Sequence, residues 1–512
     1  MPDTPDVAAA LQAANTRLRT ENAGLKAENA ELKAQLAKQA GKIARLERLV
    51  SRNSGNSSMP PSTDDQPGKK PPERKTRRGG RKPGKQPGAP GAYLAWNDHP
   101  DKTIPHVPEG MCECGKDLAE AHDLGIRYSH QVTDLPGERA ETIQHDRHAA
   151  ECSCGQVHVA DAPPEAAGAP GTVTYGLNFQ AWCVFLMVMH HVPVERCADI
   201  IESMSGTRPS DGWVHSLLER AARTVAAANK AIRALIILAR VVCGDETPLR
   251  VGPGPKTRKK YLQVACTSLL TYYFLGDRDL ASFKHFIYSD LHGTVVVHDR
   301  YVNYDAFDGI SHQLCCQHLL RDLEDAAQTY LGAIWPGQIA DALRGLIHAA
   351  SLARRQGLHA VPAELTAEHL RLFRHGVNVG LSDVRRAPGA KSKQPPARTL
   401  LECLRDRQAD VLRFLTDTAI PPTSNQAERD LRPSKTQQKI SGRLRSEKTT
   451  RHRYAIRGYA STAAKHGTAV FTAIRDALAG TPGYRPSRPA PEPHPKTVTH
   501  SNSRITKTCG LT

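Results

Sequence analysis

Three carboxylates, far apart in the chain, lie in settings that suit metal-dependent chemistry. Asp245 lies near the middle of an apolar run at 241–251, and Asp299 directly follows another at 294–298. Glu428 lies in a polar, arginine-rich stretch. A carboxylate in a buried strand costs free energy unless it gains a cation, a proton or a metal ion. We therefore expect these three residues to hold Mg²⁺ or Mn²⁺, as two ions roughly 4 Å apart that serve phosphoryl transfer.

Each carboxylate also has a simpler interpretation. Glu428 is spaced to pair with Arg432 on one face of a helix. Glu246 and Asp305 are rival acidic residues, although Glu246 is expected on the opposite face of its strand from Asp245. Taken alone, no carboxylate is distinguished from such alternatives. Their joint position in the predicted fold is what favours a shared site.

The elements around these carboxylates predict a mixed α/β core. We expect three consecutive strands, a helix, a strand, a helix and a last strand, with the strands at 241–251, 261–268, 270–276, 294–298 and 311–316. This order is typical of the ribonuclease-H-like fold, in which the first and fourth strands are neighbours. Asp245 and Asp299 would then lie together, and a later helix would bring Glu428 to them.

The charge of the chain indicates a polyanionic partner, and we expect this partner to be nucleic acid. The 512 residues include 69 Lys or Arg and 52 Asp or Glu, which gives a formal charge of +17. Residues 66–92 contain nine basic residues and one acidic residue, and residues 424–458 contain ten and three. Two basic surfaces are therefore predicted. The DNA-binding residues that we expect in them are Arg77, Arg78, Arg81, Lys82, Lys85, Arg429, Arg432, Lys435, Lys439 and Arg443.

Composition also bounds the location of the protein. No apolar run approaches the roughly 20 residues that a membrane span needs. The start of the chain lacks the basic and then apolar order of a signal peptide. Twelve scattered cysteines do not resemble a secreted disulfide framework. We expect a cytoplasmic, nucleoid-associated protein with no membrane partner.

Residues 8–50 have the heptad pattern of a coiled coil, or leucine zipper. Leucines recur at seven-residue spacing, interrupted at Gln39, and asparagines occupy three positions of the companion row; these residues are Leu11, Leu18, Leu25, Leu32 and Leu46, with Asn15, Asn22 and Asn29. Buried asparagine fixes the register of such a seam and favours a parallel dimer. We expect a homo-oligomer through this helix, because a Pro-rich linker follows it where an antiparallel hairpin would need a second arm.

Two other segments have no core-forming pattern. Residues 51–104 are expected to be a disordered basic linker, and residues 481–512 a disordered tail. The linker's Gly80–Gly88 segment has the composition of an extended arm that lies along a DNA minor groove. A solvated linker with non-specific phosphate contacts is an equal alternative.

Residues 105–165 and 170–230 predict two small modules. In the first, two Cys-x-Cys-Gly segments suit a structural Zn²⁺ site with four thiolates, namely Cys112, Cys114, Cys152 and Cys154. The alternative is four reduced cysteines without metal. The second module is helical, with Ser210 or Asp211 expected to cap a helix. Its helix, tight turn and helix suit a helix-turn-helix or a structural bundle equally.

The sequence resembles the insertion-sequence transposases of the IS sixty-six type. The resemblance extends over nearly the whole chain, and its last motif is the most specific. In order, the motifs are the leucine-zipper start, Asn53–Ser62, Gly80–Gly84, the paired cysteines, Gly244–Pro248, Asp299–Tyr301 with Tyr304, Cys316–His318 and Asn425–Pro433.

The resemblance implies an enzyme, a DDE transposase. Asp245, Asp299 and Glu428 would be its catalytic triad, in a catalytic domain at 240–480 with a largely helical insertion at about 319–415. Its DNA partners would be the terminal inverted repeats of its own element and a target, and accessory proteins of that element would assist. Two alternatives stay open, a non-catalytic DNA-binding protein with a relic nuclease core and a plain metal-dependent nuclease.

Overall fold

The structure is a computed structural model of the chain. It describes residues 4–51, short stretches between 97 and 160, and residues 173–483 without 253–257, 390–392 and 443. The chain divides into two compact units. The larger unit comprises residues 1–72, 144–202 and 208–512, and the smaller comprises residues 73–143 with 203–207.

In the smaller unit, an antiparallel bridge joins residues that lie before and after the first cysteine pair in the sequence. Met111 and Asp117 form an antiparallel bridge, and Gly115 between them has a φ of 82° that favours glycine. Asn97 and Gln131 exchange hydrogen bonds of 2.9 and 2.6 Å. In the larger unit, β1 (Ala149–Glu151) and β2 (Val157–Val159) pair antiparallel on either side of the second cysteine pair.

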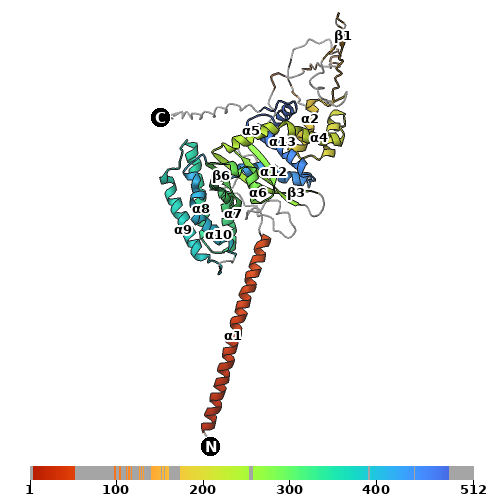
Figure 1. The fold of residues 1–512 in the computed structure, drawn as a ribbon. Helices are drawn as coiled ribbons and strands as arrows, with labels where there is room; N and C mark the ends of the chain where they lie inside the picture. Colours follow the sequence, from red (N-terminus) through yellow and green to blue (C-terminus); the bar gives the residue numbers. More distant parts are fainter. Residues whose placement is uncertain are drawn as a thin grey trace. The chain divides into compact units, whose positions relative to one another are not determined.

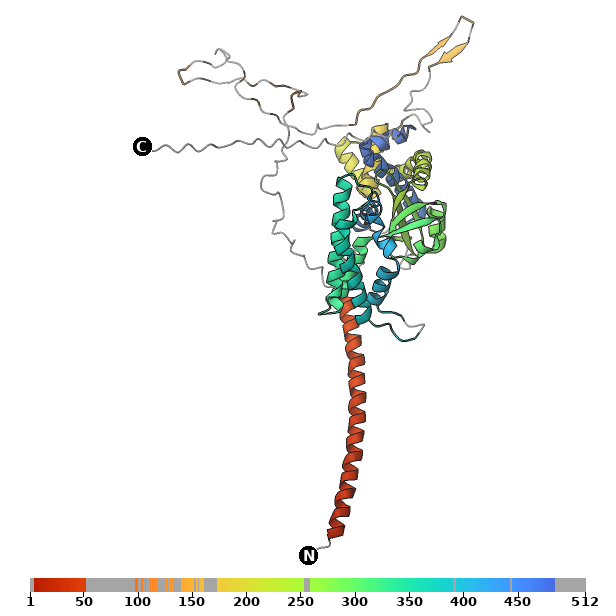
Figure 2. The same ribbon diagram turned by 90° about the vertical axis from the view of Figure 1, so that its left-hand side faces the viewer.

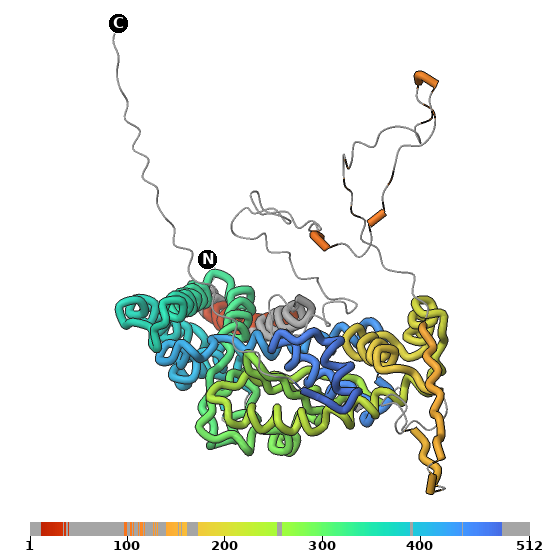
Figure 3. Tube along the Cα trace, turned by 90° about the horizontal axis from the view of Figure 1, so that it is seen from above, coloured from red at the N-terminus to blue at the C-terminus, as the bar shows by residue number. Residues whose placement is uncertain are grey.

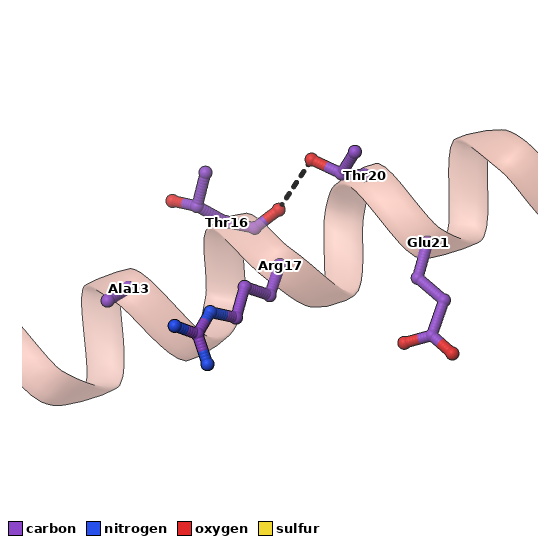
Figure 4. A pocket seen from close by; sticks show the side chains of 5 residues that line it. All are labelled: Ala13, Thr16, Arg17, Thr20 and Glu21. Atoms are coloured by element: carbon purple, nitrogen blue, oxygen red, sulfur yellow. Dashed lines mark hydrogen bonds between the residues drawn. The ribbon is translucent and has the colours of Figure 1, made fainter.

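The predicted N-terminal helix is present as α1 (Thr4–Ser51). Its seam leucines are solvent-exposed in the single chain, with Leu18 64%, Leu25 58% and Leu32 51% exposed. Figure 4 shows a shallow part of the helix surface lined by Ala13, Thr16, Arg17, Thr20 and Glu21, where the Thr20 hydroxyl donates to the Thr16 carbonyl at 3.0 Å. Pairing of this helix with a second copy stays a prediction.

A five-stranded sheet forms the centre of the larger unit, with strand order β5-β4-β3-β6-β7. The strands are β3 (Val241–Val251), β4 (Arg258–Cys266), β5 (Thr271–Gly276), β6 (Thr294–His298) and β7 (Ile310–Leu314). β3, β4 and β5 are antiparallel neighbours, whereas β6 pairs parallel with both β3 and β7. The expected pairing of the first and fourth strands is confirmed.

Alternate residues of β3 face two different hydrophobic layers, as a period of two requires. Val242 packs with α5 (Ala226–Ile237) and α6 (Leu280–Phe286) in one layer. Cys243 and Leu249 pack in the other, which includes residues of α7 (Cys316–Thr329) and α12 (Asn425–Ile440). Both faces of the sheet are therefore covered by helices (Figure 1). The helix expected after Asp299 is a short 3-10 helix instead, at Val302–Ala306.

The segment between β7 and α12 is largely helical. Its helices are α7, α8 (Trp335–Arg355), α9 (Ala363–Asp383), α10 (Pro396–Asp406) and α11 (Gln408–Leu412). They share the hydrophobic layer on the β3 and α12 side of the sheet, and Figure 2 shows the long α8 and α9 side by side. The Gln313 amide donates to the Val411 carbonyl at 2.9 Å and so fastens β7 to this segment.

The first and last helices of the core pack together. α2 (Leu177–Met189), α3 (Val194–Ser205) and α4 (Asp211–Thr224) share one hydrophobic cluster with α13 (Glu447–Lys465) and α14 (Val470–Leu478). Figure 3 shows the yellow early helices beside the blue late ones. The Ser210 hydroxyl caps α4 by accepting from the Trp213 N–H at 3.3 Å, as expected. No helix in the described part of the chain has the length and apolar character of a membrane span.

Candidate active site

Asp245 lies on β3 where the pairing with β6 has ended. β3 and β6 are aligned through Cys243 and Val297, and Asp245 pairs across β4 with Val264. Its carboxylate accepts the Glu246 N–H at 2.8 Å. Burial raises the pKa of Asp245 to about 6, and the charges of Asp299 and Glu428 add to that rise. The structure therefore brings these three carboxylates within electrostatic reach of each other.

Asp299 directly follows β6, two residues beyond the Cys243–Val297 pair. One carboxylate oxygen accepts the Tyr301 N–H at 2.8 Å, which fixes its orientation at the turn. The other oxygen lies 4.0 Å from the guanidinium Nη2 of Arg278.

Glu428 lies in the first turn of α12. Its Oε1 is 3.6 Å from Arg321 Nη1 and 3.9 Å from His318 Nε2, both on α7. This atom is buried and has no hydrogen-bond partner among the residues described. Its ion pairs are therefore with another helix and not with Arg432, the partner that helical spacing alone offers.

The starts of α7 and α12 are joined by two hydrogen bonds. The Cys316 N–H donates to the Pro422 carbonyl at 2.9 Å, and the Ser424 N–H donates to the Cys315 thiol at 3.3 Å. This connection explains why His318 and Glu428, far apart in sequence, meet. Both helices direct their N-terminal ends toward this region, where positive dipoles favour a carboxylate.

The surroundings of His318 favour its protonated form. Burial alone would lower the pKa of His318, but the neighbouring Cys315 thiol and the carboxylates of Asp245 and Asp299 outweigh it and raise that pKa to about 10. Arg321 lies one helical turn later on the same face of α7. The sequence left two roles open for His318, contact with the active site or capping of its helix, and it did not indicate Arg321.

Asp430 anchors the helix that holds Glu428. Its carboxylate accepts hydrogen bonds from Lys465 at 2.8 Å, Thr271 at 2.9 Å and Gln426 at 3.0 Å. The Lys465 ammonium also donates to two backbone carbonyls at 2.9 Å. This nearly buried ion pair ties α12 to α13 and to β5. Sequence reasoning had missed it, because its members are 35 residues apart with no local pattern between them.

The two rival carboxylates have other partners. Glu246 faces the layer opposite α12, where it receives the Tyr304 hydroxyl at 3.2 Å and pairs with Arg278 at 2.8 Å. Burial, with the charges of Asp299 and Asp245, raises the pKa of Glu246, whereas the Arg278 guanidinium opposes that rise and favours the carboxylate. Asp305 pairs with Arg407 at 2.9 Å. The expected opposite facing of Glu246 and Asp245 is confirmed by these contacts.

The predicted DNA-binding residues of α12 differ in their exposure to solvent. Arg429, Arg432 and Lys439 are exposed. Lys435 lies two turns beyond Glu428 and is half-buried; burial lowers the pKa of Lys435, while the carboxylates of Asp245 and Glu428 oppose that change. The other predicted DNA contacts, Arg77, Arg78, Arg81, Lys82, Lys85 and Arg443, lie outside the described residues.

Only some of the residues predicted to bind metal lie in the described part of the structure. In the described part of the chain, no set of three or more His, Cys, Asp or Glu side chains has the arrangement of a metal site. Cys114 and Cys154 are exposed, free cysteines. Their predicted partners, Cys112 and Cys152, lie outside the described residues.

A comparison with protein families defines the class of this α/β protein. A family model described as "Transposase IS66 family" matches residues 172–452, more than half of the chain, and its span includes Asp245, Asp299 and Glu428. The protein is thus of the transposase class. It belongs to the IS66 family, as the resemblance in its sequence predicted. A second model, a "Family of unknown function (DUF6444)", matches residues 2–95. No curated protein matches the chain significantly.

Proposed function

We propose that this protein is a DDE transposase that cuts DNA at the ends of its own mobile element and joins them to a target. The observation that supports the proposal most is that the family match spans Asp245, Asp299 and Glu428, and that the charges of the last two act on Asp245. The sheet order β5-β4-β3-β6-β7 supports a ribonuclease-H-like core, which we propose as the catalytic domain.

The three carboxylates are suited to divalent cations. Asp245 is half-buried among like charges, and Glu428 has a buried oxygen without a hydrogen-bond partner in the described structure. A cation relieves both costs, because carboxylate oxygens are the ligands that Mg²⁺ and Mn²⁺ prefer. Asp245, Asp299 and Glu428 would hold the ions. Bound metal would activate an attacking water or 3′-hydroxyl and stabilise the leaving oxygen.

The protein's own side chains would hold and orient the DNA. Lys435 lies within electrostatic reach of Asp245 and Glu428, so a phosphate close to the carboxylates would also meet its ammonium. Arg321 would serve the same purpose from α7. The exposed Arg429, Arg432 and Lys439 would contact the DNA backbone along α12.

The regions before the core would recognise and pair the DNA ends. We propose that α1 forms a parallel dimer and so brings two ends together. The cysteine pairs would hold a structural Zn²⁺, a proposal supported by the antiparallel pairs that flank each of them in sequence. The basic linker would contact the terminal repeats, with accessory proteins of the same element assisting.

Cleavage of a labelled duplex tests the catalytic proposal. The duplex has the terminal repeat that flanks the gene, and it is incubated with Mg²⁺, Mn²⁺ or EDTA. Wild type is compared with Asp245→Asn, Glu428→Gln and the matched control Asp341→Asn, whose carboxylate is exposed on α8. Binding is measured by gel shift on the same preparations, with and without the element's other proteins.

The expected result is metal-dependent cutting at the repeat end and joining of that end to a second duplex. Both site variants should bind DNA without cutting, and the control should match wild type. Binding without cutting, even with the accessory proteins present, would instead identify a DNA-binding protein with a relic core. Cutting without joining would identify a plain nuclease.

A further inference from the structure

Arg278 is a cation on the Asp299 side of the candidate active site. It lies in the turn between β5 and α6, in a part of the sequence without any of the recognised motifs. Its Nε and Nη2 atoms contact the Glu246 carboxylate at 2.9 and 2.8 Å. Nη2 also lies 4.0 Å from Asp299 Oδ2. One guanidinium thus lies between a buried carboxylate and a proposed metal ligand.

The position of Arg278 is fixed from several directions. Its guanidinium stacks over the Tyr301 ring with 4.0 Å between Cζ and the ring centroid. The Tyr301 hydroxyl donates to the Arg278 carbonyl at 2.8 Å, so the same tyrosine holds both the backbone and the side chain. Tyr301 also orients Asp299 through its N–H. Glu246, which accepts the Tyr304 hydroxyl, contacts the Nε and Nη2 edge of the Arg278 guanidinium.

Fixing an arginine in this way prepares it to bind an anion. The Arg278 side chain is 38% exposed, whereas the side chain of its partner Glu246 is only 2% exposed. The contacts to Glu246 use Nε and Nη2, and Nη1 has no hydrogen bond among the described residues. A guanidinium held by buried groups loses little entropy when it binds phosphate.

We propose that Arg278 binds a phosphate of the DNA strand beside Asp299. This inference rests on the proposed function, and it extends the DNA contacts to a different element of the core. Arg321 and Lys435 approach the carboxylates from α7 and α12, and Arg278 approaches from the β5–α6 turn. Arg321 and Lys435 lie on the Glu428 side of the carboxylates, and Arg278 lies on the Asp299 side. A bound DNA strand would therefore be held at both places. Glu246, Tyr301 and Tyr304 are then positioning residues for Arg278.

A purely structural role is the alternative, because an arginine that only neutralises Glu246 would make the same contacts. Removing Arg278 alone would leave a buried, unpaired carboxylate and would destabilise the fold under either hypothesis. The variant Arg278→Gln with Glu246→Gln separates them. It removes both charges, puts two neutral amides in place of the ion pair, and keeps an acceptor for Tyr304.

The experiment combines stability, cleavage and binding on the full-length protein. Wild type is compared with Arg278→Gln, Arg278→Lys, Glu246→Gln and the double variant. The matched control is Arg233→Gln with Asp290→Asn, which removes another ion pair of a partly exposed arginine, on α5. The probe is the duplex of the flanking terminal repeat, and its affinity is measured over a series of salt concentrations.

We expect the double variant to melt near the wild-type temperature but to cut about 100-fold more slowly, as when one preorganised donor is lost. The slope of log affinity against log salt should fall by about 0.9, the value for one phosphate contact. Arg278→Lys should restore the slope and part of the rate. A double variant with the wild-type rate and slope would overturn the proposal. If wild type does not cut, the proposed function fails, while an unchanged slope would still refute the contact.

Discussion

Asp245 on β3 and Asp299 directly after the parallel β6 each lie two residues beyond the aligned pair Cys243 and Val297. Cys243 packs on the side of the sheet that α12 covers, and Asp245, two residues further along the same strand, shares that face. The parallel pairing of β3 and β6 therefore brings these two carboxylates to the same end of neighbouring strands. Glu428 joins them only through the packing of α12.

The first prediction concerns the stability cost of assembling these carboxylates without metal. Burial raises the pKa of Asp245 to about 6, well above the ordinary value of about 3.9. Protonated Asp245 does not destabilise the folded protein, so this advantage is fully present at a pH below the ordinary pKa. It is lost as the pH rises through the folded-state pKa of about 6. Asp245→Asn should therefore raise the free energy of unfolding by roughly 1–3 kcal/mol at pH 7.5 and change it little at pH 4.

Thermal melts in EDTA at the two pH values provide the measurement, with Asp341→Asn as the exposed control. Addition of Mn²⁺ should raise the melting temperature of wild type at pH 7.5 more than that of Asp245→Asn, because a ligand stabilises the state that binds it. A variant less stable than wild type at pH 7.5 in EDTA would contradict the assignment of Asp245 to a strained site.

The sequence predicts much of this arrangement, for a physical reason. Apolar runs that end in turns define the strands, and their order led to the correct pairing of β3 with β6. Ion pairs across the fold leave no such pattern. Arg278 and Asp430 contact partners that are distant in the sequence, and the packing of the sheet and α12 brings them together. Sequence spacing does not indicate which of the many charged side chains will be buried. The helix expected after Asp299 is a short 3-10 helix, and the Tyr301 N–H before it donates to the Asp299 carboxylate.

The second prediction is that Asp430 positions Glu428. Asp430→Ala would leave the Lys465 ammonium, which is 12% exposed, without its carboxylate. Loss of one member of a buried pair costs about 3–5 kcal/mol. The free energy of unfolding, measured in urea, should fall by this amount. DNA cleavage should fall further than DNA binding, because the helix that holds Glu428 loses its attachment to β5.

Asp341→Ala, in an exposed pair with Arg344 on α8, is the matched control and should cost less than about 1 kcal/mol. The double variant Asp430→Leu with Lys465→Met should recover most of the lost stability, since replacing a buried pair with apolar groups is often neutral. Equal costs for Asp430→Ala and Asp341→Ala would show that the pair does not anchor α12.

The third prediction explains the glycine before Asp245. A Cβ at Gly244 would lie 2.5 Å from the Tyr288 hydroxyl and 3.3 Å from that of Tyr304. Gly244→Ala should therefore destabilise the protein by about 1–3 kcal/mol through overpacking. Tyr288→Phe removes the closer oxygen, so the double variant should lose less stability than Gly244→Ala alone. A double-mutant cycle measured by chemical unfolding tests this, and additive effects would exclude the close contact as the cause.

The last prediction concerns the exposed seam of α1. Leu25 is 58% exposed in the single chain, and the heptad pattern places it in the dimer seam. Leu25→Glu would put a charge into that seam and should shift the protein from dimer to monomer at micromolar concentration. Ala27→Glu places the same charge two residues away, on the outer face of the helix, and should leave the dimer intact. Sedimentation velocity measures both masses. Two variants with the same mass as wild type would mean that another surface holds the oligomer together, and a monomeric wild type would mean that α1 does not pair in this way.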